Sequence, residues 1–195
     1  VNGENAIIVV PGAASTISVA DVEARADIIR QSAVFVTQLE QPVAAAMRGL
    51  EIAHAAGTIT IFNPAPAEPV PDAIYPLCDY VTPNETEATL LTGVAVRSID
   101  DARRAGDVFL AKGAQTALIT LGENGVLLHT RASSLHVPAF NAGAVVETAG
   151  AGDAFNGGFA AALHGATCRR STVAGTPSIV GSAYGVKPGS GRPSQ

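Results

Sequence analysis

The stretch Val145–Gly158, which reads VVETAGAGDAFNGG, decides how this chain is interpreted. Its apolar pair Val145-Val146 is typical of a strand end, and the helix-compatible run Phe159–Leu163 follows its small residues. The sequence therefore predicts a strand, a glycine turn and the start of a helix. The first amides of a helix have no acceptor within it, and the helix dipole favours an anion beside them. Glycines, which lack a Cβ, let a phosphate approach the main chain.

Asp153 places a carboxylate beside this predicted anion site. A fixed carboxylate repels a simple phosphate ion. It suits a site where the carboxylate takes a proton from an attacking hydroxyl, while the amides hold the charge of a phosphoryl group in transfer. The turn has neither the lysine of the P-loop nor the glycine spacing of the dinucleotide fingerprint. A purely structural turn is the alternative, and Gly150 and Gly152 alone do not choose between the two.

Composition favours one globular domain over residues 1–195. The chain is 47% hydrophobic and 15% charged, which argues against disorder. A net charge of −5 without a basic cluster argues against nucleic-acid or anionic-membrane partners. No apolar run has the length of a membrane span and no secretory signal is visible, so we expect a cytoplasmic protein. Cys78 and Cys168 are then expected to be reduced thiols.

Apolar runs and turn residues alternate along the chain. They predict strands at 6–10, 33–37, 58–62, 80–82 and 116–120, an antiparallel pair at 126–128 and 135–137, and helices at 19–30, 41–56, 72–77, 83–91 and 98–112. The early strands are continuous apolar runs, as expected when both faces of a sheet are covered. We therefore predict an α/β fold with a doubly wound, mainly parallel sheet flanked by helices and joined by right-handed crossovers.

Polar, acidic or glycine-rich residues follow nearly every predicted strand. They are Gln38–Glu40, Asn63, Asn84 with Glu87, Thr120–Gly125 and Glu147–Asp153. Ligands of such sheets bind beyond the carboxyl ends of the strands. The pattern therefore predicts one binding edge rather than scattered polar loops.

Asn84 and Glu87 stand three residues apart at a predicted helix start, which puts both side chains on one face. An amide and a carboxylate there could organise hydrated magnesium. The alternative is a plain helix cap with an acidic first turn.

Three stretches resemble the ribokinase-like carbohydrate kinases. Gly150–Gly158 resembles their C-terminal signature, Thr82–Ala88 their magnesium-and-phosphate motif, and Thr120–Gly125 their nucleotide loop. The resemblance implies that Asp153 is the catalytic base, with Gly150, Ala151 and Gly152 in the anion hole. It implies ATP binding by Asn84, Thr120, Leu121, Gly122, Glu123, Asn124, Gly125, Gly152 and Asp153, and sugar binding by Glu40 and Asp153. It also implies a Mg2+ site at Glu87 through water and a K+ site at Glu147, Ala149, Lys187, Gly189 and Ser194.

The implied reaction is phosphoryl transfer from ATP to the primary hydroxyl of a pentose, with D-ribose the first choice and fructose or a nucleoside as alternatives. The family's N-terminal region, which carries a glycine-rich sugar segment, a β lid and the dimer contact, has no counterpart here. Glu147 replaces the usual aspartate, and Pro177 interrupts the expected adenine-flanking helix. A homodimer is possible by resemblance, although the lid that forms it is missing. Two alternatives are a truncated, weakly active or inactive protein that binds nucleotide only, and a binding regulator without a transfer step.

Overall fold

The computed structural model describes residues 10–140 and 148–168. Contacts divide the chain into two compact units, Ala6–Ala139 and a second unit of Val1–Asn5 with Phe140–Gln195. The single domain predicted over 1–195 stays a prediction. The predicted strands at 6–10 and before the glycine turn fall on residues 1–9 and 141–147, outside the described residues except for Val10.

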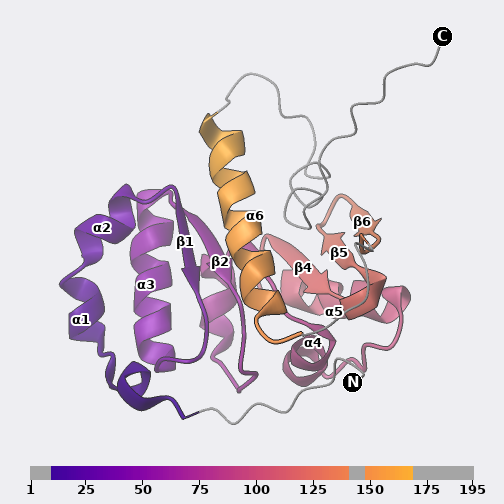
Figure 1. The fold of residues 1–195 in the computed structure, drawn as a ribbon, viewed down its shortest axis with the longest axis horizontal. Coiled ribbons are helices and arrows are strands. Elements are labelled where there is room, and N and C mark those ends of the chain that lie inside the picture. Colours follow the sequence, from indigo (N-terminus) through magenta and orange to yellow (C-terminus); the bar gives the residue numbers. More distant parts are fainter. Residues whose placement is uncertain (1–9, 141–147, 169–195) are drawn as a thin grey trace. The chain divides into compact units, whose positions relative to one another are not determined.

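The larger unit is built on a mixed six-stranded sheet (Figure 1). Its strands are β1 (Val34–Thr37), β2 (Ile59–Phe62), β3 (Tyr80–Val81), β4 (Thr116–Thr120), β5 (Val126–His129) and β6 (Ser134–Val137). They lie side by side in chain order, with β1 to β4 parallel and β5 and β6 antiparallel to their neighbours. The prediction of a mainly parallel α/β sheet flanked by helices is confirmed.

Five α-helices of this unit are described: α1 (Val19–Glu23), α2 (Ala26–Gln31), α3 (Val43–Ala56), α4 (Glu85–Thr92) and α5 (Ile99–Ala111). Short 3-10 helices form η1 (Gly12–Thr16), η2 (Asp72–Leu77) and η3 (Gly122–Asn124). Right-handed crossovers that advance in one direction put their helices on one face of a sheet. Accordingly α3 contacts β1 and β2, and α5 contacts β4 and β5.

Local signals set most helix ends as predicted. Pro42 precedes α3, and Gly57 ends it with φ 72°. Gly93 ends α4 in the same way, with φ 74°. The single helix predicted at 19–30 is wrong in its middle, because the structure has two short helices separated at Arg25. Ser18 caps the first of them, since its side chain accepts a hydrogen bond from the Asp21 amide.

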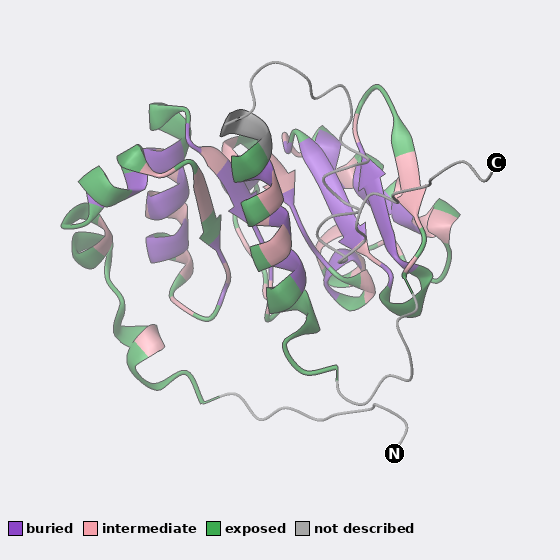
Figure 2. Cartoon of the chain, turned by 45° about the horizontal axis from the view of Figure 1, so that its top comes forward, coloured by how far each residue is buried: buried purple, intermediate pink, exposed green. Residues whose placement is uncertain are grey.

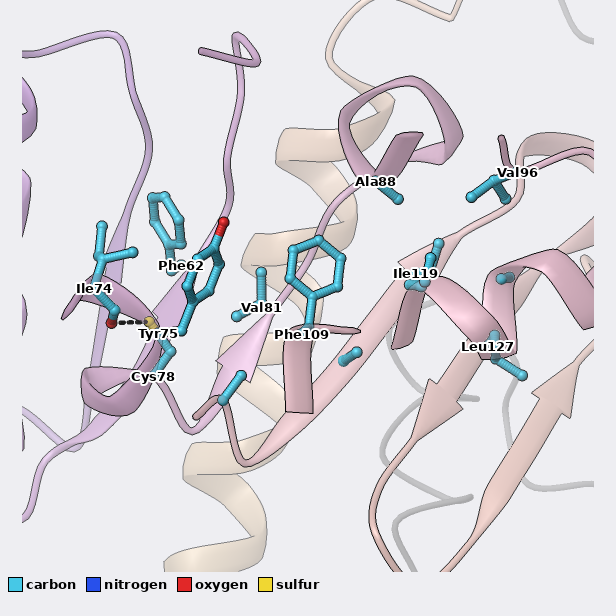
Figure 3. Close-up of a cluster of buried hydrophobic side chains, with 14 of the residues drawn as sticks. Phe62, Ile74, Tyr75, Cys78, Val81, Ala88, Val96, Phe109, Ile119 and Leu127 are labelled. Atoms are coloured by element: carbon cyan, nitrogen blue, oxygen red, sulfur yellow. Dashed lines mark hydrogen bonds between the residues drawn. The ribbon is translucent and has the colours of Figure 1, made fainter. Parts of the chain in front are cut away.

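The core of the larger unit lies between the sheet and its helices. Phe62, Val81 and Ile119 point into it from three strands and are fully buried (Figure 3). The rings of Tyr75 and Phe109 meet them in a tilted pair with centroids 5.7 Å apart. Residues on the opposite face of the sheet are also buried, at Ile61 of β2, Leu118 of β4, and Val126 and Leu128 of β5. Figure 2 colours much of these strands as buried. Burial of both faces explains why these strands read as continuous apolar runs.

Cys78 is buried in this core, where its Sγ donates to the Ile74 carbonyl oxygen at 3.1 Å. Burial strongly raises the pKa of its thiol, so the reactive thiolate is suppressed. The side chain of Cys168 lies outside the described residues.

The described part of the second unit is dominated by α6 (Ala151–Cys168). Phe155, Phe159 and Leu163 recur every four residues and form its buried face, with the two rings stacked at 6.1 Å. Among the described residues, no helix is both long and apolar enough to cross a membrane.

Candidate functional site

The carboxyl ends of β1 to β4 meet at one edge of the sheet, because these strands are parallel. The residues that directly follow them are Gln38, Asn63, Thr82 and Leu121, and Asn84 lies two residues after Thr82. Backbone contacts join the last two strand ends, since the Thr120 amide donates to the Pro83 carbonyl oxygen at 2.9 Å and Asn84 bridges Thr120. The structure thus brings the strand-end residues of the larger unit to a common edge.

Asn63 joins three of these strand ends. Its Oδ1 accepts from Gln38 Nε2 at 3.0 Å, and its Nδ2 donates to the Thr82 carbonyl oxygen at 2.7 Å. Its own amide donates to the Thr37 carbonyl oxygen at 2.9 Å, and the residue is only 6% exposed. The sequence shows Asn63 only as a polar residue after a predicted strand and does not reveal these contacts. Its partners lie 25 and 19 residues away, so no local pattern could reveal them.

Glu40, the predicted sugar ligand, is exposed at the end of β1. The residues around it are well anchored. The Leu39 amide donates to the Ala65 carbonyl oxygen at 2.9 Å, and Gln41 Nε2 donates to Thr37 Oγ1 at 2.6 Å. The Glu40 carboxylate therefore projects from a fixed main chain, as a hydroxyl-binding acceptor requires.

Asn84 and Glu87 form a reciprocal helix cap at the start of α4. The Glu87 amide donates to Asn84 Oδ1 at 2.9 Å, and the two Glu87 carboxylate oxygens accept from the Asn84 amide and Nδ2 at 2.9 and 2.8 Å. Glu87 is 8% exposed, and burial raises the pKa of its carboxyl although the hydrogen bond from the Asn84 amide lowers it. The capping alternative therefore describes the structure.

The same contacts decide how Glu87 could serve a metal. Each carboxylate oxygen already accepts one hydrogen bond and keeps a further acceptor site. The pair could therefore accept hydrogen bonds from the water shell of a magnesium ion. Among the described residues, no group of three or more His, Cys, Asp or Glu side chains could hold a metal ion.

The predicted nucleotide loop, Thr120–Gly125, folds as η3 between β4 and β5. The Leu121 amide donates to the Gly125 carbonyl oxygen at 2.8 Å, which closes the loop. Gly122 and Gly125 both have positive φ, at 52° and 92°. Glu123 and Asn124 are exposed, and a hollow of about 300 Å3 lies beside the loop. The hollow is lined by Glu85, Val96, Arg97, Ser98, Ile99, Leu121 and Asn124.

The glycine turn of the second unit opens α6. Gly150 has φ 73°, and Ala151 is the first helical residue. The Ala151 amide donates back to the Thr148 carbonyl oxygen at 3.2 Å, and the Ala154 amide donates to the Gly150 carbonyl oxygen at 2.9 Å. The amide of Gly152 thus belongs to the group that a helix start leaves without an intrahelical acceptor.

Asp153 lies in the first turn of α6 and is exposed. A Cβ added to Gly150 would be 4.0 Å from Asp153 Oδ2, so the carboxylate stands over the turn. A Cβ at Gly152 would meet nothing within 4 Å. The backbone at Gly152 is therefore open, and one carboxylate lies beside the turn.

Several predicted residues lie outside the described residues. They are Glu147, Lys187, Gly189 and Ser194 of the potassium site, and Pro177 of the adenine side. Of the potassium ligands only Ala149 is described, and it is exposed directly before the turn.

Comparison with known proteins shows the family to which this chain belongs. Residues 1–174 match the model of the pfkB family of carbohydrate kinases. The chain belongs to this family, whose carbohydrate-kinase character agrees with the glycine turn, the strand-end edge and the capped Asn84–Glu87 pair.

Within this family, the chain is similar to sugar kinases of several organisms. A ribokinase of Staphylococcus aureus (strain COL) is 40% identical over 162 residues, which is 83% of this chain and 53% of the relative. A deoxyribokinase of Salmonella typhi is 38% identical over 160 residues, 82% of this chain and 52% of the relative. The structure of an Arabidopsis thaliana ribokinase complexed with ribose and ATP has a TM-score of 0.75 at 26% identity, covering 94% of this chain and 59% of that one. The chain spans about half the length of the curated relatives it matches.

Proposed function

We propose that this chain transfers the γ-phosphoryl group of ATP to the primary hydroxyl of a pentose, with D-ribose the preferred acceptor. The observation that carries the proposal is the turn at Gly150–Asp153, where an exposed carboxylate stands over a glycine turn at the start of an 18-residue helix. The names of the relatives and the ribose and ATP in the Arabidopsis complex support the substrates.

In the proposed reaction Asp153 accepts the proton of the sugar hydroxyl as its oxygen attacks the γ-phosphorus. The bond from that phosphorus to the β,γ-bridging oxygen breaks, and ADP leaves. Amides of the turn, Gly152 foremost, donate to the oxygens of the phosphoryl group in transfer, where negative charge is concentrated. Glu40 accepts hydrogen bonds from sugar hydroxyls, and Thr120–Gly125 lines the nucleotide.

Two ions complete the proposal. Magnesium, when bound, neutralises charge on the ATP phosphates, and Asn84 with Glu87 would hold its water shell. A potassium ion beside the turn would use Glu147, the Ala149 carbonyl oxygen and the 187–194 segment. Rates that do not respond to a potassium titration would count against this part.

The test compares Asp153→Asn with Asp100→Asn. Both aspartates are exposed in the first turn of a helix, but Asp100 lies on α5 and pairs with Arg103. ATP-dependent phosphorylation of D-ribose and 2-deoxy-D-ribose should fall about 100- to 10,000-fold in Asp153→Asn, the usual contribution of a general base, and should be unchanged in Asp100→Asn. Equal activity of the two variants would refute the assignment of the base.

A second candidate is a protein that binds ATP without transferring its phosphoryl group. The favouring observation is that the chain spans only about half the length of its curated relatives. Calorimetric binding of ATP with magnesium, without phosphorylation of any pentose, would favour this candidate.

A further inference from the structure

The end of strand β2 is tied to both neighbouring strand ends by one buried side chain, that of Asn63. We infer that Asn63 is a positioning residue: it fixes the Gln38–Glu40 segment and, through Glu40, the acceptor sugar. This inference rests on the proposed function. It assigns Asn63 no contact with substrate, and so no catalytic role.

The orientation of the Asn63 amide is dictated by its partners. The Thr82 carbonyl oxygen can only accept, so the Asn63 nitrogen must face it at 2.7 Å. Asn63 Oδ1 is thereby turned to the other side, where it accepts from Gln38 Nε2 at 3.0 Å. A carboxylate cannot replace this amide, since it has no hydrogen to donate to a carbonyl oxygen.

A second contact reinforces the first. The Leu39 amide donates to the carbonyl oxygen of Ala65, two residues beyond Asn63, at 2.9 Å. The two residues that precede Glu40 are therefore both held by the loop that follows β2. Glu40 itself is exposed, so its position depends on this anchored main chain rather than on packing of its side chain.

The end of β3 and the Asn84 segment, on the proposed nucleotide side, are fixed by other hydrogen bonds. The Thr82 amide donates to the Phe62 carbonyl oxygen at 2.9 Å, which secures the end of β3 without Asn63. Asn84 and Glu87 hold each other through bonds spanning three residues. Loss of the Asn63 side chain should therefore loosen the Glu40 segment and leave the Asn84 segment in place.

The matched variants are Asn63→Ala and Thr60→Val. Thr60 is a buried polar residue at the opposite end of the same strand, and its Oγ1 donates to the Leu77 carbonyl oxygen at 2.7 Å and accepts from the Asp79 amide at 2.8 Å. Both variants remove buried hydrogen bonds from β2, so both should lower the melting temperature. Only Asn63→Ala changes the edge that carries Glu40.

Steady-state kinetics of the 195-residue chain separates the two roles. In Asn63→Ala the KM for D-ribose should rise about tenfold, the effect of losing roughly one hydrogen bond, while the KM for ATP stays within about twofold. Thr60→Val should change neither constant. Equal rises in both constants, or an unchanged KM for D-ribose, would overturn the inference.

Hydrogen exchange keeps the inference testable if the unsubstituted chain transfers no phosphoryl group, which would count against the proposed function alone. Amides of Leu39 and Glu40 should then exchange faster in Asn63→Ala, and those of Glu87 and Ala88 should be unchanged. Unchanged exchange at Leu39 and Glu40, or faster exchange at both segments, would overturn the positioning role.

Discussion

Replacing Gly125 by alanine should damage the fold far more than replacing Gly122, although both glycines lie in the same candidate nucleotide loop. Gly125 has φ 92° and ψ −133°, a combination open in practice to glycine alone. A Cβ there would lie 2.1 Å from the Val137 carbonyl oxygen and 2.6 Å from the Ala139 amide nitrogen. Both are backbone atoms, so no side chain can rotate away to make room.

The magnitude follows from these two costs. A strained backbone of this kind costs about 1–3 kcal/mol, and overpacking adds about 1–3 kcal/mol, so we expect a loss of about 3–5 kcal/mol. For a chain of this length each kcal/mol lowers the melting temperature by about 2–4 °C, which gives a decrease of about 10 °C. At Gly122 the φ is 52° and the nearest atom to an added Cβ, Glu85 Oε1, is 4.0 Å away. Only the left-handed conformation is penalised there, by about 1 kcal/mol or 3 °C.

The assay is thermal unfolding of both variants beside the unsubstituted chain, followed by circular dichroism. Calorimetry with ATP then asks whether the surviving fold keeps its loop. Similar melting temperatures for Gly122→Ala and Gly125→Ala would refute the reasoning, because the two differ chiefly in the backbone collision.

Three further outcomes are expected. Burial raises the pKa of Glu87 above its ordinary value of 4.5, so the folded protein holds this proton more tightly than the unfolded chain and loses stability as pH rises from about 4.5 through the raised pKa. The Glu87→Gln variant has no such carboxyl, so its melting temperature minus that of the unsubstituted chain should increase over this pH range. A decrease in that difference would contradict the argument. Gly106→Ala should cost about 1–3 kcal/mol, because its Cβ would lie 2.6 Å from Cδ2 of His129. Gly165→Ala, whose Cβ would meet nothing within 4 Å, should instead stabilise α6 by about 0.5–1 kcal/mol. Urea unfolding that gave Gly106→Ala the higher free energy of unfolding would disprove this. Asn84→Ala should cost about 2 kcal/mol, since it removes both a helix cap and one hydrogen-bond donor to Glu87. Ser98→Ala should cost about 1 kcal/mol, because its cap is a single bond from the Asp101 amide. Equal losses of unfolding free energy in urea would show that Glu87 does not need the Asn84 donor.

Much of the fold could be predicted because its signals are local. The ends of α3 and α4 are set by Pro42, Gly57 and Gly93, and the apolar runs of the strands need no partner to be recognised. The break between α1 and α2 could not be predicted, because neither Ala24 nor Arg25 is a helix-breaking residue. Tertiary packing decides it: Ala26 and Ile29 are buried against Ile52 and Ala53 of α3, which overrides local propensity.

Ser98 forms only half of a capping box at the start of α5. The Ser98 hydroxyl accepts from the Asp101 amide, but the Asp101 carboxylate accepts from the Arg97 amide, one residue before the cap. The Arg104 guanidinium also engages the Asp101 carboxylate. An aspartate can complete such a box, since at the start of α1 the Asp21 carboxylate accepts from the Ser18 amide at 2.8 Å. At the start of α4, Glu87 likewise reaches back to its own cap residue, Asn84.

Part of the candidate site could also be predicted from the sequence, and part could not. Sequence reasoning found the residue types at the strand ends, because polar residues after apolar runs are visible in the sequence. It could not find the bonds of Asn63 to Gln38 and Thr82, since pairing across strands depends on register. The sequence also could not decide between a helix cap and a magnesium site at Asn84 and Glu87, because the same two residues suit both equally well.

The consecutive order of strands β1 to β6 has a consequence for synthesis of the protein. Each strand pairs with the strand made just before it, so none must wait for a later segment or be inserted between two partners already in place. Pairings close in sequence need only short loops to close, which keeps their entropic cost low. Ribosomes add about 5–20 residues per second, slow enough for each strand to join the growing sheet as it emerges. A nascent chain released from the exit tunnel as far as Thr120 could already hold β1 to β4, and with them the edge that carries Glu40, Asn63 and Asn84.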